Sequence, residues 1–204
     1  PTVEIAGRDY GWLDLQTGIA SPFDILANDY PAQYANSEGT PLVKWADCKT
    51  TLKDISTEKL HYVKVPENHI VIDFDIKDEN GNKCFDLNAK AAMQWPPTYA
   101  ETSKSGQGIH LHYIYNGDVT KLSRIFDTDL EVKVFSGNSS LRRMLTKCND
   151  ISIASINSGL PLKGDTKVVN WDGIKSEKQL RTMVIKNLKK EYHAATKPSV
   201  DYIY

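Results

Sequence analysis

Three stretches of the chain alternate apolar and polar side chains with a period of two residues, which is typical of a β-strand with one buried face. The stretches are Ile70–Ile76, Gly108–Tyr115 and Leu130–Val134. In each stretch the apolar side chains share one face, and we expect that face to pack on a core. The other, open face then carries six polar side chains: Asp73, Asp75, His110, His112, Glu131 and Lys133.

Other segments predict short helices and two further strands. The expected helices cover 22–28, 52–60, 88–95, 119–126 and 139–147, and the expected strands cover 3–5 and 151–156. The helix at 88–95 should end before Pro96, because proline cannot continue a helix. Near the C-terminus, Ser176 and Gln179 fit a capping box, and apolar residues recur at i, i+4 spacing at Leu180, Val184, Leu188 and Tyr192. This pattern predicts an amphipathic helix.

The composition is that of an ordinary globular protein. The chain has 204 residues, of which 40% are apolar and 25% are charged, and this length is most simply one domain. Its apolar runs are shorter than the ~20 residues of a membrane helix, and the N-terminus lacks a signal-peptide pattern. We therefore expect a cytoplasmic protein without a membrane partner. The sequence starts at Pro1 rather than at methionine, and we expect neighbouring domains outside it.

The charge and the cysteines restrict the possible functions. A formal net charge of −1 gives no overall basic field, so any contact with nucleic acid must come from local patches. The three cysteines, Cys48, Cys84 and Cys148, are far apart and odd in number. This spacing argues against a disulfide framework or a zinc ribbon.

Asp73 and Asp75 are the leading candidates for chemistry. They lie two residues apart on one expected strand, so their carboxylates share a face, where like charges repel each other unless a cation is present. Mg²⁺ or Mn²⁺ ions prefer such oxygen ligands, and Glu131 on another strand can supply a third carboxylate. The simpler alternative is an edge strand with an acidic, solvated face.

A turn that contains glycine and several basic residues are candidates for binding phosphate. Glycine lets backbone N–H groups approach an anion closely, and Ser105, Gly106 and His110 belong to a turn that leads into a strand. The basic candidates are Lys133, Arg142, Arg143 and Lys147, which could hold a triphosphate or a template phosphate. The alternative is that the histidine and the arginines are ordinary surface residues.

Three of these segments together carry a resemblance to a known family. They are Ile72-Asp73-Phe74-Asp75, Ser105-Gly106-Gln107-Gly108-Ile109-His110 and Leu130-Glu131-Val132-Lys133. In this order they resemble the three motifs of the archaeo-eukaryotic primase superfamily, specifically the primase-polymerase domains of phages and mobile elements. The resemblance covers about residues 68–165, and it includes the segments 139–143 and 158–163.

The resemblance implies an α+β fold, with a mainly antiparallel, RRM-like sheet flanked by helices. The single domain would consist of an N-terminal α/β flank (1–65), a catalytic core (66–170), and a C-terminal amphipathic helix and tail (171–204). The implied activity is template-dependent nucleotidyl transfer, as a DNA primase or DNA polymerase, during phage or mobile-element replication in the bacterial host cytoplasm.

The resemblance also implies a set of ligands. Two Mg²⁺ or Mn²⁺ ions would be held by Asp73, Asp75 and Glu131, and Ser105 and His110 would contact the phosphates of the incoming nucleotide. The implied partners are a DNA template and primer, nucleotide triphosphates, and a helicase domain outside this sequence. The zinc-binding cysteine cluster of some relatives is absent from the sequence.

Two other functions compete with this interpretation. His110-Leu111-His112 also fits the His-hydrophobic-His motif of rolling-circle replication endonucleases, which bind one metal and cut DNA with a tyrosine. Tyr192, which is followed in the sequence by Lys197, would be that tyrosine. This function leaves Asp73 and Asp75 without a role. An RRM-like binder of single strands is the third possibility, and it should carry aromatic rather than acidic residues on the open face.

Overall fold

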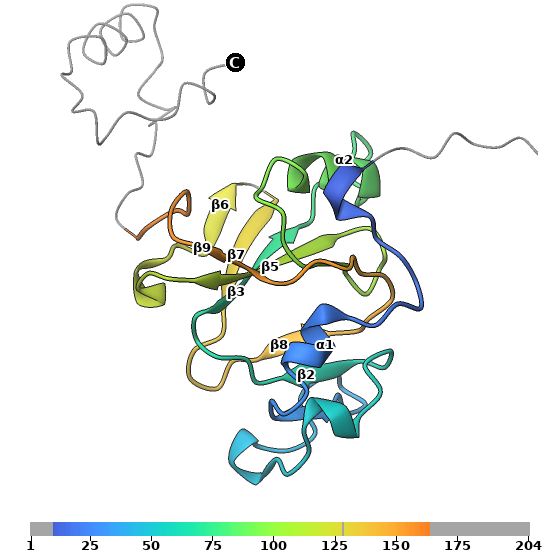
Figure 1. The fold of residues 1–204 in the computed structure, drawn as a ribbon, viewed down its shortest axis with the longest axis vertical. Helices are drawn as coiled ribbons and strands as arrows, with labels where there is room; N and C mark the ends of the chain where they lie inside the picture. Colours follow the sequence, from blue (N-terminus) through green and yellow to red (C-terminus); the bar gives the residue numbers. More distant parts are fainter. Residues whose placement is uncertain (1–9, 128, 164–204) are drawn as a thin grey trace, which may run out of the picture. The chain divides into compact units, whose positions relative to one another are not determined.

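The computed structural model describes residues 10–127 and 129–163 (Figure 1). They form an α+β fold with two mostly antiparallel sheets and two α-helices. The expected strand at 3–5 and the expected C-terminal helix lie outside the described residues. No helix in the described part of the chain has the length and apolar character needed to cross a membrane.

The main sheet has six strands and contains all three alternating stretches. Its order is β4 (Ala100–Thr102), β5 (Ile109–Tyr115), β3 (His69–Phe74), β7 (Leu130–Val134) and β6 (Ile125–Asp127), all antiparallel. The sixth strand, β9 (Ala154–Ile156), runs parallel to β5 beyond the end of β4. The expected strands at 70–76, 108–115 and 130–134 are therefore neighbours, and β9 confirms the second half of the strand expected at 151–156.

A second, smaller sheet consists of β1 (Ala32–Tyr34), β2 (His61–Val63) and β8 (Leu141–Arg143). β8 lies where a helix was expected at 139–147, so that prediction is wrong. Leu141 and Arg143 are buried while Arg142 between them is exposed, which is the two-residue period of a strand. Pairing with β2 gives the backbone of this segment the hydrogen bonds that a helix would otherwise supply.

The helices are fewer than expected, and the one expected at 88–95 begins and ends three residues earlier. The two α-helices are α1 (Pro22–Leu26), which Ser21 caps by accepting from the Asp24 backbone N–H, and α2 (Phe85–Ala92). Isolated 3-10 turns cover Gly11–Leu13, Trp45–Asp47, Leu52–Asp54 and Val119–Lys121. The helix expected at 52–60 is reduced to the turn Leu52–Asp54. The helix expected at 119–126 is reduced to the turn Val119–Lys121, and Ile125 and Phe126 belong to strand β6 instead. In the first case Ile55 is already extended and the next backbone N–H, at Ser56, donates to the Tyr34 hydroxyl.

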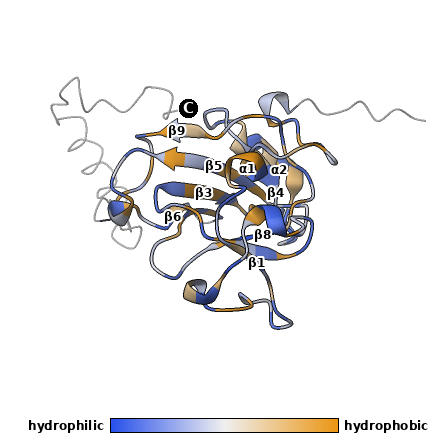
Figure 2. Ribbon diagram, turned by 60° about the horizontal axis from the view of Figure 1, so that its bottom comes forward, coloured by the Kyte–Doolittle hydropathy of each residue, from blue (hydrophilic) through white to orange (hydrophobic). Residues whose placement is uncertain are grey.

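Both faces of the main sheet are covered, so the face expected to be open is not open along its whole length. On one face Ile72, Phe74 and Leu111 pack with α2, as the alternation predicts. On the other face Val71 packs in a second core with Phe23 of α1 and Leu141 of β8. Figure 2 shows polar and apolar stretches within the same strands, β3 and β5 included. The polar side chains of that second face therefore lie between the two sheets rather than on a free surface.

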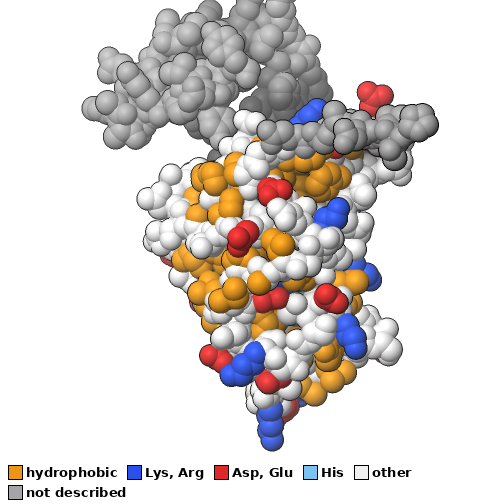
Figure 3. All heavy atoms as spheres, turned by 45° about the vertical axis from the view of Figure 1, so that its right-hand side comes forward, with side chains coloured by type: hydrophobic (Ala, Val, Ile, Leu, Met, Phe, Trp, Pro, Cys, Tyr) orange, Lys and Arg blue, Asp and Glu red, His pale blue; other side chains and the backbone are white. Residues whose placement is uncertain are grey.

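The outer surface shows no large patch of one charge on the face in Figure 3. Acidic and basic side chains are interspersed there with apolar ones. This distribution agrees with the net charge of −1.

Candidate functional site

Four ionisable side chains form a row across four neighbouring strands of the main sheet. Glu101 of β4 is paired with His110 of β5, His110 with Asp73 of β3, and Asp73 with Glu131 of β7. Side chains of directly paired residues lie on the same face about 5 Å apart. The row brings together three residues expected from the sequence and adds Glu101. All three residues of β4 are buried, so this strand lacks the alternation of buried and exposed residues by which the other site residues were predicted.

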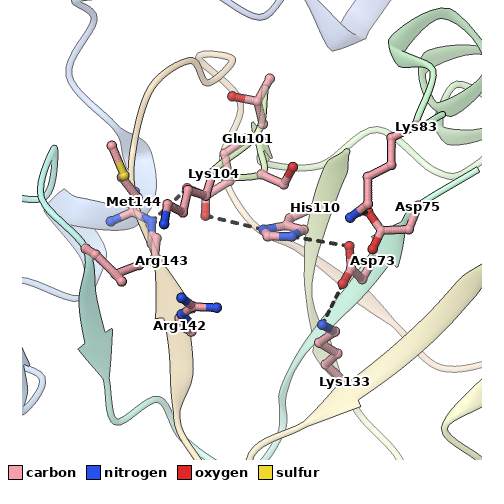
Figure 4. Close-up of a pocket in the computed structure, with 13 residues that line it drawn as sticks. Asp73, Asp75, Lys83, Glu101, Lys104, His110, Lys133, Arg142, Arg143 and Met144 are labelled. Carbon is pink, nitrogen blue, oxygen red and sulfur yellow. Dashed lines mark hydrogen bonds and ion pairs between the residues drawn. The ribbon is translucent and has the colours of Figure 1, made fainter. Parts of the chain in front are cut away.

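Three members of the row, Glu101, His110 and Asp73, line a pocket of about 180 Å³ between the two sheets (Figure 4). The main sheet and its loops contribute Asp73, Asp75, Lys83, Glu101, Lys104, His110 and Lys133, among others. Arg142, Arg143 and Met144 line the side formed by β8. A neighbouring hollow is lined by Asp73, Asp75, Lys77, Lys83, Asp129, Glu131 and Lys133. Two aspartates and two lysines are therefore common to both spaces.

Asp73 lies at the centre of the site and has only 8% of its side chain exposed. The Lys133 ammonium lies 2.6 Å from its Oδ2, and His110 Nε2 lies 3.3 Å from its Oδ1. Burial alone would raise the pKa of Asp73, but His110 and Lys133 outweigh it and hold the pKa well below its usual value. Asp73 is therefore an anion at neutral pH, and its buried Oδ1 lacks a well-formed hydrogen bond.

The other two expected carboxylates lie beside Asp73 but do not converge on one point. The Lys83 ammonium is 2.7 Å from Asp75 Oδ1, whereas Glu131 is largely exposed and lies 3.9 Å from the Lys133 ammonium. Among the described residues, no three His, Cys, Asp or Glu side chains are close enough to hold a metal ion as they stand. A lysine ammonium group lies at each aspartate, and Asp73 also has His110 beside it.

His110 lies between two acidic groups and is mostly buried, with 16% of its side chain exposed. Asp73 lies on its Nε2 side, and Glu101 Oε1 is 4.0 Å from its Nδ1. Burial lowers the pKa of His110, but the two carboxylates more than reverse this effect and raise the pKa to about 9. His110 is therefore a cation at neutral pH that faces the pocket.

The turn from β4 to β5 is closed by its own hydrogen bonds. Ser103 N donates to Gly108 O at 2.9 Å, and Gly106 N donates to Ser103 O at 2.8 Å with a φ of +74° at Gly106. The Ser105 hydroxyl lies 3.1 Å from the Ser103 hydroxyl. The pocket is lined by Ser103 and Lys104, and not by Ser105 and Gly106 as expected from the sequence. Ser105 and Gly106 shape the turn that presents Ser103 and Lys104.

Gly108 is required at the end of this turn because no side chain fits there. A Cβ atom at this position would lie 2.8 Å from Asp75 Oδ1 and 3.0 Å from the Phe74 carbonyl oxygen. The absence of a Cβ lets β5 approach the end of β3 next to the second aspartate.

The three basic residues expected downstream differ in their surroundings. Arg142 is exposed and lines the pocket. Arg143 is buried, and its guanidinium group donates to Asp24 and Glu101, at 2.5 Å and 2.7 Å. Lys147 is exposed and lies outside the lining of the pocket. Only Arg142 of these three therefore has a free basic group at the site.

His112 does not form a second exposed histidine beside His110. Its side chain is 0% exposed, its Nδ1 lies 2.9 Å from His69 Nε2, and its Nε2 lies 3.4 Å from Glu101. Burial lowers its pKa, so it is neutral inside the core. This burial weighs against a two-histidine metal site of the rolling-circle type, and Tyr192, the expected nucleophile, lies outside the described residues.

No protein-family model matches the chain, and no curated protein sequence matches it either.

Proposed function

We propose that this chain is the catalytic domain of a template-dependent nucleotidyltransferase, a DNA primase or DNA polymerase that works with two divalent metal ions. The observation that carries the proposal is the row in which Asp73 lies between His110 and Glu131, beside two adjoining hollows that also contain Asp75 and basic side chains. Carboxylates beside cationic groups are the combination that a metal-bound nucleotide triphosphate requires.

The carboxylates suit Mg²⁺ or Mn²⁺ by their chemistry. Asp73, Asp75 and Glu131 line one hollow, all three present oxygen atoms, and Asp73 Oδ1 makes no well-formed hydrogen bond. These three residues would hold the ions after the lysines withdraw. When bound, the ions would activate the primer 3′-hydroxyl and neutralise charge on the triphosphate.

The basic groups around the pocket suit the phosphates of the nucleotide. His110, Lys104, Lys133 and Arg142 line the pocket from both sheets. His110 carries its charge at neutral pH, because its pKa is about 9. These groups would hold the triphosphate against the carboxylate row, and the protein would act chiefly by positioning and by balancing charge.

The antiparallel main sheet supports the further proposal of an RRM-like core with the primase fold. The strands β5, β3 and β7, which carry the three motif segments, lie side by side in it. On this proposal the chain acts on a DNA template and primer in phage or mobile-element replication inside a bacterial cell, with a helicase domain elsewhere in the full protein.

Primer extension tests the proposal. Asp73→Asn and Asp75→Asn should each reduce nucleotide incorporation in Mn²⁺ at least about 100-fold, because each removes a charged metal ligand. Glu67→Gln is the matched control, since Glu67 is exposed just before β3 and outside the pocket. It should extend the primer like the wild type, and thermal melting should show that all three variants are folded. Normal extension by either aspartate variant would exclude the two-metal mechanism.

A further inference from the structure

A short hairpin places Lys83 at the mouth of the site. The chain continues past Asp75, turns back, and forms an antiparallel bridge between Lys77 and Lys83. The Asp78 carboxylate stabilises the turn, accepting from the backbone N–H groups of Asn80 and Asn82 at 2.9 Å each. Paired residues share a face, and so do residues two apart on a strand. The hairpin therefore directs Lys83 to the face that carries Asp75.

Lys83 is in direct contact with the second aspartate. Its ammonium nitrogen is 2.7 Å from Asp75 Oδ1, and 41% of its side chain is exposed. Lys133 makes the equivalent contact with Asp73 at 2.6 Å. Figure 4 shows the two lysines reaching the two aspartates from different sides. Each carboxylate of the pair thus has its own ammonium group.

A divalent cation and the Lys83 ammonium compete for the same carboxylate. Asp75 Oδ1 is occupied by the ammonium in this structure, and a divalent cation bound to Asp75 would repel that group. An ion pair this exposed is weak, and the lysine stem is flexible, so Lys83 can leave at little cost. Lys83 also lines the pocket that contains Lys104, His110 and Arg142, where phosphates would lie.

We propose that Lys83 changes partner during ligand binding. It neutralises Asp75 while no divalent cation is bound, and it contacts the phosphates of the nucleotide once the cation has taken its place. This inference rests on the proposed function and adds Lys83 to it as a residue that positions the nucleotide. Removing the lysine charge should therefore have opposite effects on the two ligands.

Equilibrium binding measures both effects without any turnover. The probes are Mn²⁺ alone and the Mn²⁺ complex of dATP, each titrated calorimetrically into the wild type, Lys83→Gln and Lys83→Arg, without primer or template. Lys83→Gln should bind Mn²⁺ alone about 3-fold more tightly and Mn²⁺–dATP about 3- to 10-fold more weakly, as expected for the loss of one exposed ion pair. Lys83→Arg keeps the charge and should stay close to the wild type for both probes.

Lys90→Gln is the matched control, because Lys90 is exposed on α2 and lies outside both hollows. It should bind both probes like the wild type, and thermal melting should show that every variant is folded. If Lys83→Gln changes neither affinity, or changes both in the same direction, the exchange is excluded while the proposed function stands. If the wild type binds neither probe, the proposed function falls together with the exchange.

Discussion

Glu101 and Arg143 form an ion pair in which each side chain is only 1% exposed, with Arg143 Nε 2.7 Å from Glu101 Oε2. The two residues belong to different sheets, β4 and β8. Asp24 of α1 contacts the same guanidinium group at 2.5 Å. Burial alone would raise the pKa of Glu101, but Arg143 and the neighbouring histidines hold it well below its usual value. Glu101, which contacts His110, is therefore charged, and it is held in place by Arg143 and Asp24.

The neighbouring arginines 142 and 143 should have opposite mutational effects. Arg143→Met should lower the free energy of unfolding by about 3–5 kcal/mol, because it leaves Glu101 buried without its partner. Arg142→Met should change stability by less than about 0.5 kcal/mol but weaken nucleotide binding, since Arg142 is exposed at the pocket. Urea denaturation and Mn²⁺–dATP titration of both variants check this pair of outcomes. Equal stability of the two variants would contradict the buried ion pair.

Gly108→Ala should disturb the site, whereas Gly106→Ala should not. The new Cβ at residue 108 would press on Asp75 and on the Phe74 carbonyl, so we expect a loss of about 2 kcal/mol of stability together with weaker Mn²⁺ binding. Gly106 has open space around its Cβ position but a φ of +74°, so alanine there should cost about 1 kcal/mol of backbone strain and leave metal affinity unchanged. Thermal melting and Mn²⁺ titration separate the two effects.

His110→Gln should weaken the binding of Mn²⁺–dATP about 10-fold, because it removes a cation that lines the pocket. Ser105→Ala should have little effect on this affinity, since the Ser105 hydroxyl faces Ser103 within the turn. Isothermal titration of both variants tests the difference. A strong loss in Ser105→Ala alone would show that the serine, and not the histidine, holds the phosphates.

The pH dependence of stability should have a maximum near pH 6.5. Burial lowers the pKa values of His61, His69 and His112, so below pH 6.5 the unfolded chain takes up these protons before the folded protein does, and stability falls on acidification. His110 has a raised pKa of about 9, so its contribution is complete below pH 6.5 and is lost as the pH rises through 9. Each proton by which the folded and unfolded states differ changes the free energy of unfolding by about 1.4 kcal/mol per pH unit.

Urea denaturation between pH 5 and 9, in the presence of a chelator, measures this profile. His69→Gln should reduce the slope of the free energy of unfolding below pH 6.5 by the contribution of one proton. His110→Gln should reduce the slope above pH 6.5. A wild-type profile without an alkaline slope would show that His110 is neutral in the folded protein.

Alternation along the chain predicted the central strands well, and it predicted which side chains share a face. Ile72 and Phe74 are buried together on one side of β3, and Asp73 lies on the other side with His110 and Glu131. The local pattern is sufficient to predict these strands because every second side chain of each strand packs into the same core.

Tertiary contacts decided the features that alternation did not predict. The helix expected at 139–147 is instead a strand because β2 is available for pairing, and β2 lies 80 residues earlier in the chain. Arg143 and His112 have the residue types of binding groups, but both are buried and both pack on the ring of Phe23 of α1. The role of Glu101 could not be predicted from the residues next to it in the sequence, because its partners, His110 and Arg143, come from two other strands.

The contact between α1 and β8 has a consequence for biosynthesis. Asp24 meets Arg143 only after 119 further residues have been made, and β2 has no β8 to pair with until the same point. At about 5–20 residues per second, the N-terminal flank leaves the ribosome several seconds before its partner strand. During that interval Phe23 and Val63, which are fully buried in the finished protein, lack Leu141 of β8, with which they share a core. Until β8 has been made, a chaperone that binds exposed apolar side chains would therefore protect the nascent flank.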